Sequence, residues 1–158
     1  MTNQITLCEL TAADKDDWKS LWLGYLEFYK ATLPNDTLES TWQRILTRSG
    51  SLRCIGARDP VTGELVGITH YLLHESAWTP KPVCYLQDLF VLPSRRGSGV
   101  GRILIDAVAE QARKLNCGKL YWLTQEGNAQ ARALYDKLAH LTEFVRYDFE
   151  LTKAPTSR

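Results

Sequence analysis

Residues 85–101 read YLQDLFVLPSRRGSGVG, and this stretch decides the fold. Its first half, residues 85–92, is an apolar run typical of a buried strand, whereas residues 100–115 carry apolar side chains at helical spacing. The glycine-rich loop between them therefore lies at a helix N-terminus, where backbone N–H groups lack intrahelical partners and the helix dipole places positive charge. An isolated G-x-G is most simply a turn with solvated arginines, but this order of strand, loop and helix predicts a site for a phosphate group.

The spacing within the loop narrows the choice of phosphate ligand. A dinucleotide fingerprint needs G-x-G-x-x-G, yet Arg102 stands three residues after Gly99, and the G-K-[ST] ending of a P-loop is absent. The pattern that fits is R-x-x-G-x-G, formed by Arg96, Gly99 and Gly101. It resembles the coenzyme A pyrophosphate loop of the GNAT superfamily of N-acetyltransferases.

Segments on both sides of the loop extend this resemblance. Residues 87–93 (QDLFVLP) are similar to the family's central strand, which ends in an aliphatic residue, any residue and proline. Residues 119–125 then form a buried-strand pattern, and residues 128–135 follow as N-x-x-A-x-x-L-Y, similar to a helix of the family. The resemblance covers about residues 85–147. Residues 121–147 further resemble the Hpa-type branch, which contains histone and D-amino-acid acetyltransferases.

Length and composition bound the fold and exclude some functions. At 158 residues and 44% hydrophobic content, the chain is expected to form one domain, residues 1–158. The net charge of +1 gives no basic footprint, so we expect no nucleic-acid partner. The N-terminus lacks a signal-peptide pattern and no apolar run approaches the ~18 residues of a membrane span, which predicts a cytoplasmic protein without a membrane partner.

The cysteine pattern bears on metals and redox chemistry. Cys8, Cys54, Cys84 and Cys117 form no C-x-x-C pair. Three of them lie in strand-like runs, where a thiol is usually buried. Because a zinc site needs paired ligand spacing, we predict reduced thiols and no metal.

Hydrophobic patterning predicts an α+β fold in which helices flank a mixed, GNAT-like β-sheet. Thr11 to Asp14 resembles a capping box at the start of the first helix. Residues 75–82, which contain Pro80 and Pro82, are expected to be an irregular connection. The predicted order is β-α-α-β-β-β-α-β-α-β, with strands at 5–10, 53–58, 65–74, 85–92, 119–125 and 144–151, and with helices starting near residues 11, 37, 100 and 128.

The C-terminal end departs from the family, which usually closes with two strands after the last helix. Here only residues 144–151 show a strand pattern, with Val145, Tyr147 and Phe149 on one face. An unpaired apolar edge is an association hazard, so we predict a homodimer in which this strand meets the partner subunit. The alternative is that the N-terminal segment covers the strand.

The resemblance implies acetyl-CoA as the cofactor. The loop amides would hold its pyrophosphate, with added charge from Arg95 and Arg96, and its pantetheine arm would bond to the backbone of the central strand. A strand amide near Val91 would then serve as the oxyanion donor. The implied cofactor-binding residues are Phe90, Val91, Leu92, Arg95, Arg96, Gly97, Ser98, Gly99, Val100, Gly101, Arg102, Asn128 and Tyr135.

Tyr135 occupies the family position of the acid that protonates the departing thiolate. A Tyr hydroxyl with a pKa near ~10 stays protonated at neutral pH and can donate to a thiolate of conjugate pKa ~8.5. Tyr135 also belongs to an apolar stripe with Ala131, Leu134 and Leu138, so a core role is the alternative. Asn128 is explained by an N-cap, and the family adds a bond to the cofactor arm.

Asp88 is the candidate general base, because it is a carboxylate within an apolar strand. Polyamine-acetylating relatives carry two acids at these positions, and here Gln87 replaces one of them. The alternative is a structural acid that accepts backbone hydrogen bonds. His70 and His74 share a strand face that could border the acceptor site, although a satisfied structural histidine is the commoner outcome.

Aromatic residues are the main candidates for acceptor recognition. Those on the first helix recur at helical spacing, which is usually a core pattern. Trp78 stands among prolines in the expected connection and is the aromatic residue most expected to line the site. The predicted acceptor-site residues are Trp22, Tyr25, Tyr29, Tyr71, Trp78 and Gln87.

These observations predict an acetyl-CoA-dependent N-acetyltransferase that moves an acetyl group to the primary amine of a small molecule or amino acid. The amine would attack directly in a ternary complex, without a cysteine intermediate. One alternative is a lysine acetyltransferase acting on proteins or histone tails, which should show a long acidic groove. The other is a non-catalytic acyl-CoA sensor, which would keep the Arg96 loop but release no thiol.

Overall fold

The computed structural model describes residues 4–152. These residues fall into two compact units that divide between Leu123 and Thr124, and each unit is described by itself. No helix in this described part of the chain is long and apolar enough to cross a membrane.

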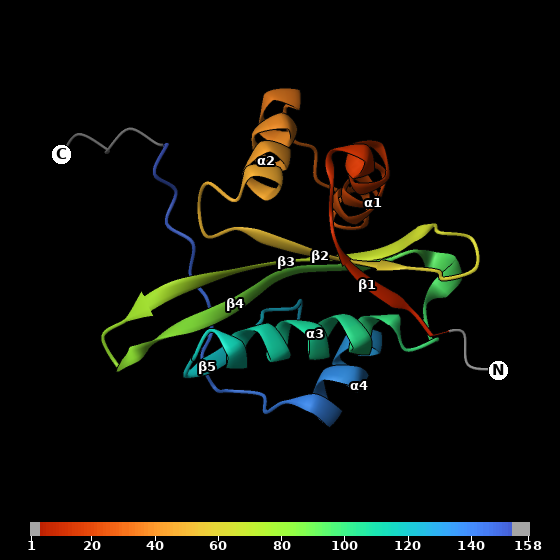
Figure 1. Cartoon of the computed structure of the whole chain (residues 1–158). Helices are drawn as coiled ribbons and strands as arrows, with labels where there is room; N and C mark the ends of the chain where they lie inside the picture. Colours follow the sequence, from red (N-terminus) through yellow and green to blue (C-terminus); the bar gives the residue numbers. More distant parts are fainter. Residues whose placement is uncertain (1–3, 153–158) are drawn as a thin grey trace. The chain divides into compact units, whose positions relative to one another are not determined.

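The first unit is built on one mixed sheet with strands in the order β1-β2-β3-β4-β5 (Figure 1). Neighbouring strands from β1 to β4 pair antiparallel, and β4 pairs with β5 in parallel. The strands span Thr6–Glu9, Arg53–Arg58, Leu65–Ser76, Thr79–Val91 and Lys119–Tyr121. This mixed sheet confirms the predicted fold class.

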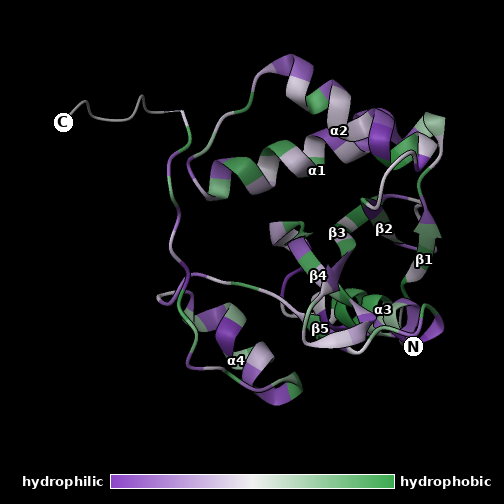
Figure 2. Cartoon of the chain, turned by 90° about the vertical axis from the view of Figure 1, so that its left-hand side faces the viewer, coloured by the Kyte–Doolittle hydropathy of each residue, from purple (hydrophilic) through white to green (hydrophobic). Residues whose placement is uncertain are grey.

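Helices cover both faces of this sheet. Figures 1 and 2 show α1 (Lys15–Phe28) and α2 (Asn35–Thr47) on one face and α3 (Val100–Lys114) on the other. The core beneath α1 and α2 is rich in aromatic residues, including Trp18 and Trp42, which are 1% and 2% exposed. Each helix buries its apolar stripe against the sheet, as the helical spacing predicts.

The start of α1 confirms the predicted cap. The Asp14 carboxylate accepts hydrogen bonds from the Thr11 backbone N–H at 2.8 Å and from the Thr11 hydroxyl at 3.2 Å. Its other oxygen forms an ion pair with Arg58 of β2. Burial favours the neutral acid, but these bonds outweigh burial and lower the pKa of Asp14. The carboxylate therefore ties the beginning of α1 to the sheet.

The prediction of an irregular connection at residues 75–82 is wrong. β3 and β4 instead continue to a tight hairpin, where Ser76 pairs with Thr79. A register irregularity between His74 and Ser76 accommodates Pro80 and Pro82, whose missing N–H groups would disturb a regular ladder. A proline is tolerated in a strand when the local pairing is already irregular.

The second unit contains α4 (Ala129–Leu138), followed by residues 139–152 without a strand. The predicted final strand at 144–151 is therefore not formed. Figure 2 shows hydrophilic and hydrophobic colours alternating along this segment, and its apolar side chains are exposed by 78–92%. A strand exists only when a neighbour pairs with it, so the alternating pattern by itself could not produce one.

Candidate active site

A pocket of about 370 Å³ opens on the face of the sheet that α1 and α2 cover. Helix α1, helix α2, the loop that follows α2 and strands β3 and β4 all contribute to its wall. The lining residues are Trp22, Thr41, Arg44, Gly50, Ser51, Leu52, His70, Leu72, Gln87 and Asp88. They combine a carboxylate, a guanidinium, an imidazole and apolar surface in a volume suited to a small ligand.

A β-bulge in β4 places two neighbouring polar side chains in this pocket. His70 pairs with Asp88, but the next residue of β3, Tyr71, pairs with Leu86, so Gln87 is an extra residue in β4. Residues that oppose each other in antiparallel strands share a face, which puts Asp88 with His70 and Leu86 with Tyr71. Both Gln87 and Asp88 consequently line the pocket.

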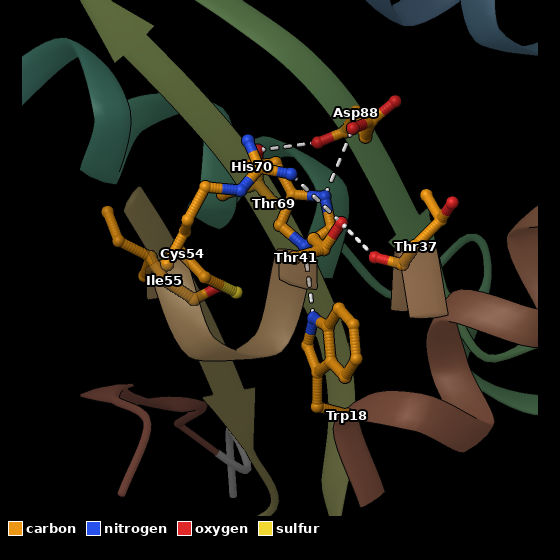
Figure 3. Close-up of polar contacts among 9 residues, drawn as sticks. Trp18, Thr37, Thr41, Cys54, Ile55, Thr69, His70 and Asp88 are labelled. Atoms are coloured by element: carbon orange, nitrogen blue, oxygen red, sulfur yellow. Dashed lines mark hydrogen bonds and ion pairs between the residues drawn. The ribbon is translucent and has the colours of Figure 1, made fainter. Parts of the chain in front are cut away.

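Asp88 is held by a buried hydrogen-bond chain. Figure 3 shows the His70 imidazole between the Trp18 indole and the Asp88 carboxylate, with Trp18 Nε1 to His70 Nε2 at 3.0 Å and His70 Nδ1 to Asp88 Oδ2 at 3.0 Å. An indole N–H can only donate, so His70 Nε2 accepts and the ring proton resides on Nδ1. His70 therefore donates to Asp88, whose side chain is 16% exposed and reaches the pocket.

Aromatic rings of α1 pack beside this hydrogen-bond chain, and among them Trp22 lines the pocket. Trp22 stacks on Tyr25 with centroids 4.9 Å apart, and Tyr25 contacts Tyr29 at the same centroid distance. Burial, followed by the neighbouring Asp88 carboxylate, raises the pKa of the Tyr25 hydroxyl above its usual value. Tyr25 thus stays protonated and can donate a hydrogen bond to the carboxylate.

The glycine-rich loop has the backbone geometry of an anion site. Gly97 and Gly99 have φ angles of +79° and +91°, a region that side-chain-bearing residues rarely adopt. Gly99 is the N-cap of α3, so the first amides of that helix have no partners within it. The predicted loop is confirmed as a strand-to-helix connection, and its ligand remains a prediction.

The two arginines before the glycines are anchored to the protein by different kinds of contact. Arg95 forms an ion pair with Asp59, a residue that is 4% exposed. Arg96 donates from Nε to the Val91 carbonyl at 3.2 Å, and its guanidinium lies over the rings of Phe28 and Phe90. Asp59 therefore offsets the charge of Arg95, whereas the contacts of Arg96 orient its guanidinium without neutralising it, and the predicted long-range charge of Arg96 stays a prediction.

The central strand separates from its parallel neighbour next to the loop. Pairing between β4 and β5 is confined to the three residues 83–85 of β4, whereas β4 continues to Val91. Phe90 is buried, while Val91 and Leu92 are half-buried, so their side chains belong to the packed interior. The Leu92 N–H already donates to the Val66 carbonyl and the Val91 carbonyl accepts from Arg96, so a role for the backbone of this stretch in cofactor binding stays a prediction.

The second unit places the remaining predicted cofactor residues on α4. The Asn128 side chain accepts from the Ala131 N–H at 3.3 Å, which confirms its N-cap role. Tyr135 is half-buried, as are Ala131, Leu134 and Leu138 of the same stripe. Both the catalytic and the packing interpretations of Tyr135 remain open.

Four of the six predicted acceptor residues, Tyr25, Tyr29, Tyr71 and Trp78, are not among the residues that line the pocket. Tyr71 is buried on the opposite face of β3, because it is the strand neighbour of His70. Trp78 lies at the tip of the hairpin and is 94% exposed. His74 also lies outside the pocket and contacts the Tyr121 hydroxyl at 3.0 Å. Trp78 lies at this turn because the expected connection is a hairpin, so a role for Trp78 in acceptor binding stays a prediction that this pocket does not support.

The sequence interpretation missed the pocket residues of α2 and its following loop, among them Thr41, Arg44 and Ser51. They occupy the polar side of a predicted helix or a short loop, where solvated residues are normal. No local sequence signal distinguishes them, since only the tertiary fold brings them beside β4.

The comparisons with known proteins decide the family. The Acetyltransferase (GNAT) family model matches residues 15–140. The chain belongs to this family. This GNAT acetyltransferase is 33% identical over 147 residues to the D-amino-acid N-acetyltransferase of Saccharomyces cerevisiae, which covers 93% of this chain and 91% of the yeast protein. The predicted Hpa-type GNAT resemblance and the predicted acetyltransferase activity are thereby confirmed.

More distant relatives of this acetyltransferase act on other amines. It is 30% identical to an aminoglycoside N(6')-acetyltransferase of Stenotrophomonas maltophilia over 82% of each chain. The solved structure of AAC(6')-Iy with a CoA-containing bisubstrate analogue matches with a TM-score of 0.80 at 20% identity, over 93% of this chain and 98% of that chain. At that identity the structural match supports the fold only.

Proposed function

We propose that this acetyltransferase moves the acetyl group of acetyl-CoA to a primary amine of a small molecule or amino acid. The observation that carries the proposal is the position of the Asp88 carboxylate. Asp88 lies on β4, the strand that leads into the glycine-rich loop, and its side chain reaches a small pocket. A base and a phosphate-binding loop on one continuous segment, residues 88–101, suit transfer from a CoA thioester to an amine.

The chemistry is a direct displacement in a ternary complex. Asp88 takes the proton of the bound ammonium group, the neutral nitrogen attacks the thioester carbonyl, and a backbone amide near Val91 stabilises the oxyanion. The C–S bond then breaks and the thiolate takes a proton, for which Tyr135 is the proposed donor. The nitrogen loses its second proton, and a proton from solvent restores the Tyr135 hydroxyl. One such oxyanion donor is typically worth about 3 kcal/mol of barrier.

Two features favour a small acceptor. The pocket volume of about 370 Å³ lies at the lower end of the range for small-molecule sites and is short for an extended peptide. The yeast relative that matches over most of its length is named for D-amino acids. We therefore place amino acids first among the acceptors, and rank a protein-modifying enzyme or an acyl-CoA sensor lower.

A free-CoA release assay against a panel of amines tests this function directly. The panel contains small amines, both enantiomers of several amino acids, an aminoglycoside and a lysine-containing histone-tail peptide. Release with small amines is the expected result. Release with the peptide alone would favour the protein modifier, and tight acetyl-CoA binding without release for any amine would favour the sensor.

We further propose that the enzyme is a homodimer. The exposed apolar side chains of residues 144–151 alternate along the chain, and pairing with a partner subunit would complete the strand that the single chain does not form. Light scattering at micromolar concentration should give twice the 18.0 kDa chain mass. A monomer, or a dimer that survives deletion of residues 144–158, would contradict this interface.

The domain and compartment predictions also remain proposals. The family match at residues 15–140 runs across both compact units, which supports one acetyltransferase domain over residues 1–158. We propose a cytoplasmic location, where acetyl-CoA is available, and no nucleic-acid partner. Fractionation of cells expressing the tagged chain would test the location.

A further inference from the structure

The charged groups of the pocket have opposite signs. Asp88 is the acid among its lining residues, and Arg44 of α2 is the arginine. An ammonium group is attracted to the first and a carboxylate to the second. A pocket that holds both charges matches a zwitterion better than it matches a simple amine.

Arg44 has N–H donors that its contacts within the protein do not use. Its Nη2 donates to the Thr41 hydroxyl and its Nε to the Ser40 carbonyl, each at 3.3 Å, whereas a guanidinium carries five N–H donors. Within residues 4–152 no ion pair includes Arg44, although the neighbouring Arg48 pairs with Glu9. Arg44 is thus a pocket-lining cation held by neutral acceptors.

Trp22 supplies a second, independent sign of a missing acceptor. Its ring lines the pocket, the residue is 8% exposed, and its indole N–H has no hydrogen-bond partner in the described part of the chain. Buried polar groups are nearly always satisfied, and the exceptions often mark ligand sites. The unpaired donor marks the wall of the pocket where the Trp22 ring contacts His70, with ring centroids 4.8 Å apart, as a place where polar partners are incomplete.

We propose that Arg44 selects acceptors that carry a carboxylate. The inference rests on the proposed acetyltransferase function of the same pocket. The acceptor's amine lies toward Asp88 and His70, and its carboxylate lies toward α2. Arg44 is a specificity residue in this arrangement, because it contacts the substrate away from the reacting atoms.

The first test compares an amino acid with the amine that lacks only its carboxylate, for example phenylalanine and phenethylamine. Wild type should show the higher kcat/KM for the amino acid. Arg44→Gln should lower kcat/KM for the amino acid by about 10- to 100-fold, since it removes a charge-assisted contact, and should leave the amine within a few-fold. Arg48→Gln is the matched control, because it removes the same charge outside the pocket.

A charge reversal sharpens the test. Arg44→Glu should reject the amino acid and improve the acetylation of a diamine, whose second ammonium group would meet the new carboxylate. Melting curves identify any variant that fails to fold. In that case the preference of the wild-type enzyme for the amino acid over the matching amine tests the proposal without the variant.

The outcomes separate the two levels of inference. Acetylation of amines without preference for a carboxylate, or equal losses for both acceptors in Arg44→Gln, would overturn the role of Arg44 and leave the proposed function intact. Absence of thiol release with every acceptor would instead overturn the proposed function.

Discussion

Replacing Asp88 with Asn tests the centre of the proposed mechanism. The amide keeps the shape of the carboxylate, 3.0 Å from His70, but cannot take a proton from the incoming ammonium group. General-base catalysis contributes about 10²- to 10⁴-fold, so kcat/KM should fall by that factor. Exchanging a charge-assisted hydrogen bond for a neutral one should cost about 1 kcal/mol, or roughly 2–4 °C in Tm for a chain of this length. CoA release and a melting curve measure the two effects.

The control is Asp17→Asn, which makes the same chemical change at an exposed position of α1. It should leave both turnover and Tm close to wild type. The acetyl-CoA-induced rise in Tm should persist in Asp88→Asn, because the loop that is proposed to bind the cofactor is unaltered. Near-normal turnover in Asp88→Asn would refute the base role, and loss of the acetyl-CoA effect would assign Asp88 to the scaffold.

Three further substitutions test separate parts of the account. Gly99→Val forces a branched side chain onto a φ of +91°, so it should abolish the stabilisation by acetyl-CoA. That stabilisation is about 2.7 kcal/mol when acetyl-CoA is at one hundred times its Kd. An unchanged thermal shift in the variant would contradict the assignment of the phosphate loop. Tyr135→Phe should lower kcat by roughly 10²-fold with Tm and cofactor binding unchanged, and normal turnover would make Tyr135 a packing residue. Asp14→Asn should cost about 1–3 kcal/mol at pH 7, because it weakens the bonds from Thr11 and Arg58. The pKa of Asp14 is lowered in the folded chain, so this stabilisation is present above the ordinary Asp pKa of ~3.9 and is lost as pH falls through the folded value. The free energies of unfolding of variant and wild type, measured by urea unfolding, should therefore converge in acid.

Local patterns predicted most of the first unit. The strand predicted at residues 53–58 has the bounds of β2, whose middle residues are buried on both faces. Helical spacing located α1, α2 and α3, because each helix buries a single face whose period is visible in the sequence. The predictions failed where a neighbour decides the outcome. Most of residues 75–82 became strand through pairing across a hairpin, and residues 144–151 form no strand in the described part of the chain.

The same distinction separates the two halves of the candidate site. The glycine-rich loop is a continuous segment whose backbone conformation requires glycine, so the loop could be predicted from its residue types. The acceptor pocket is assembled from α1, α2, β3, β4 and a loop. Arg44 therefore looked like any solvated helix residue, and Trp78 looked like a site residue only because its surroundings were mistaken for a connection.

The bulge at Gln87 shows how small a feature can decide the chemistry of this enzyme. In a regular strand Asp88 would share the face of Leu86, toward α3, and Gln87 alone would face α1. The extra residue turns Asp88 to the face of His70 and leaves Gln87 beside it in the pocket. Strict alternation thus assigns the proposed base to the wrong side of the sheet. Its actual position depends on a one-residue mismatch between β3 and β4, which neither strand's sequence reveals by itself.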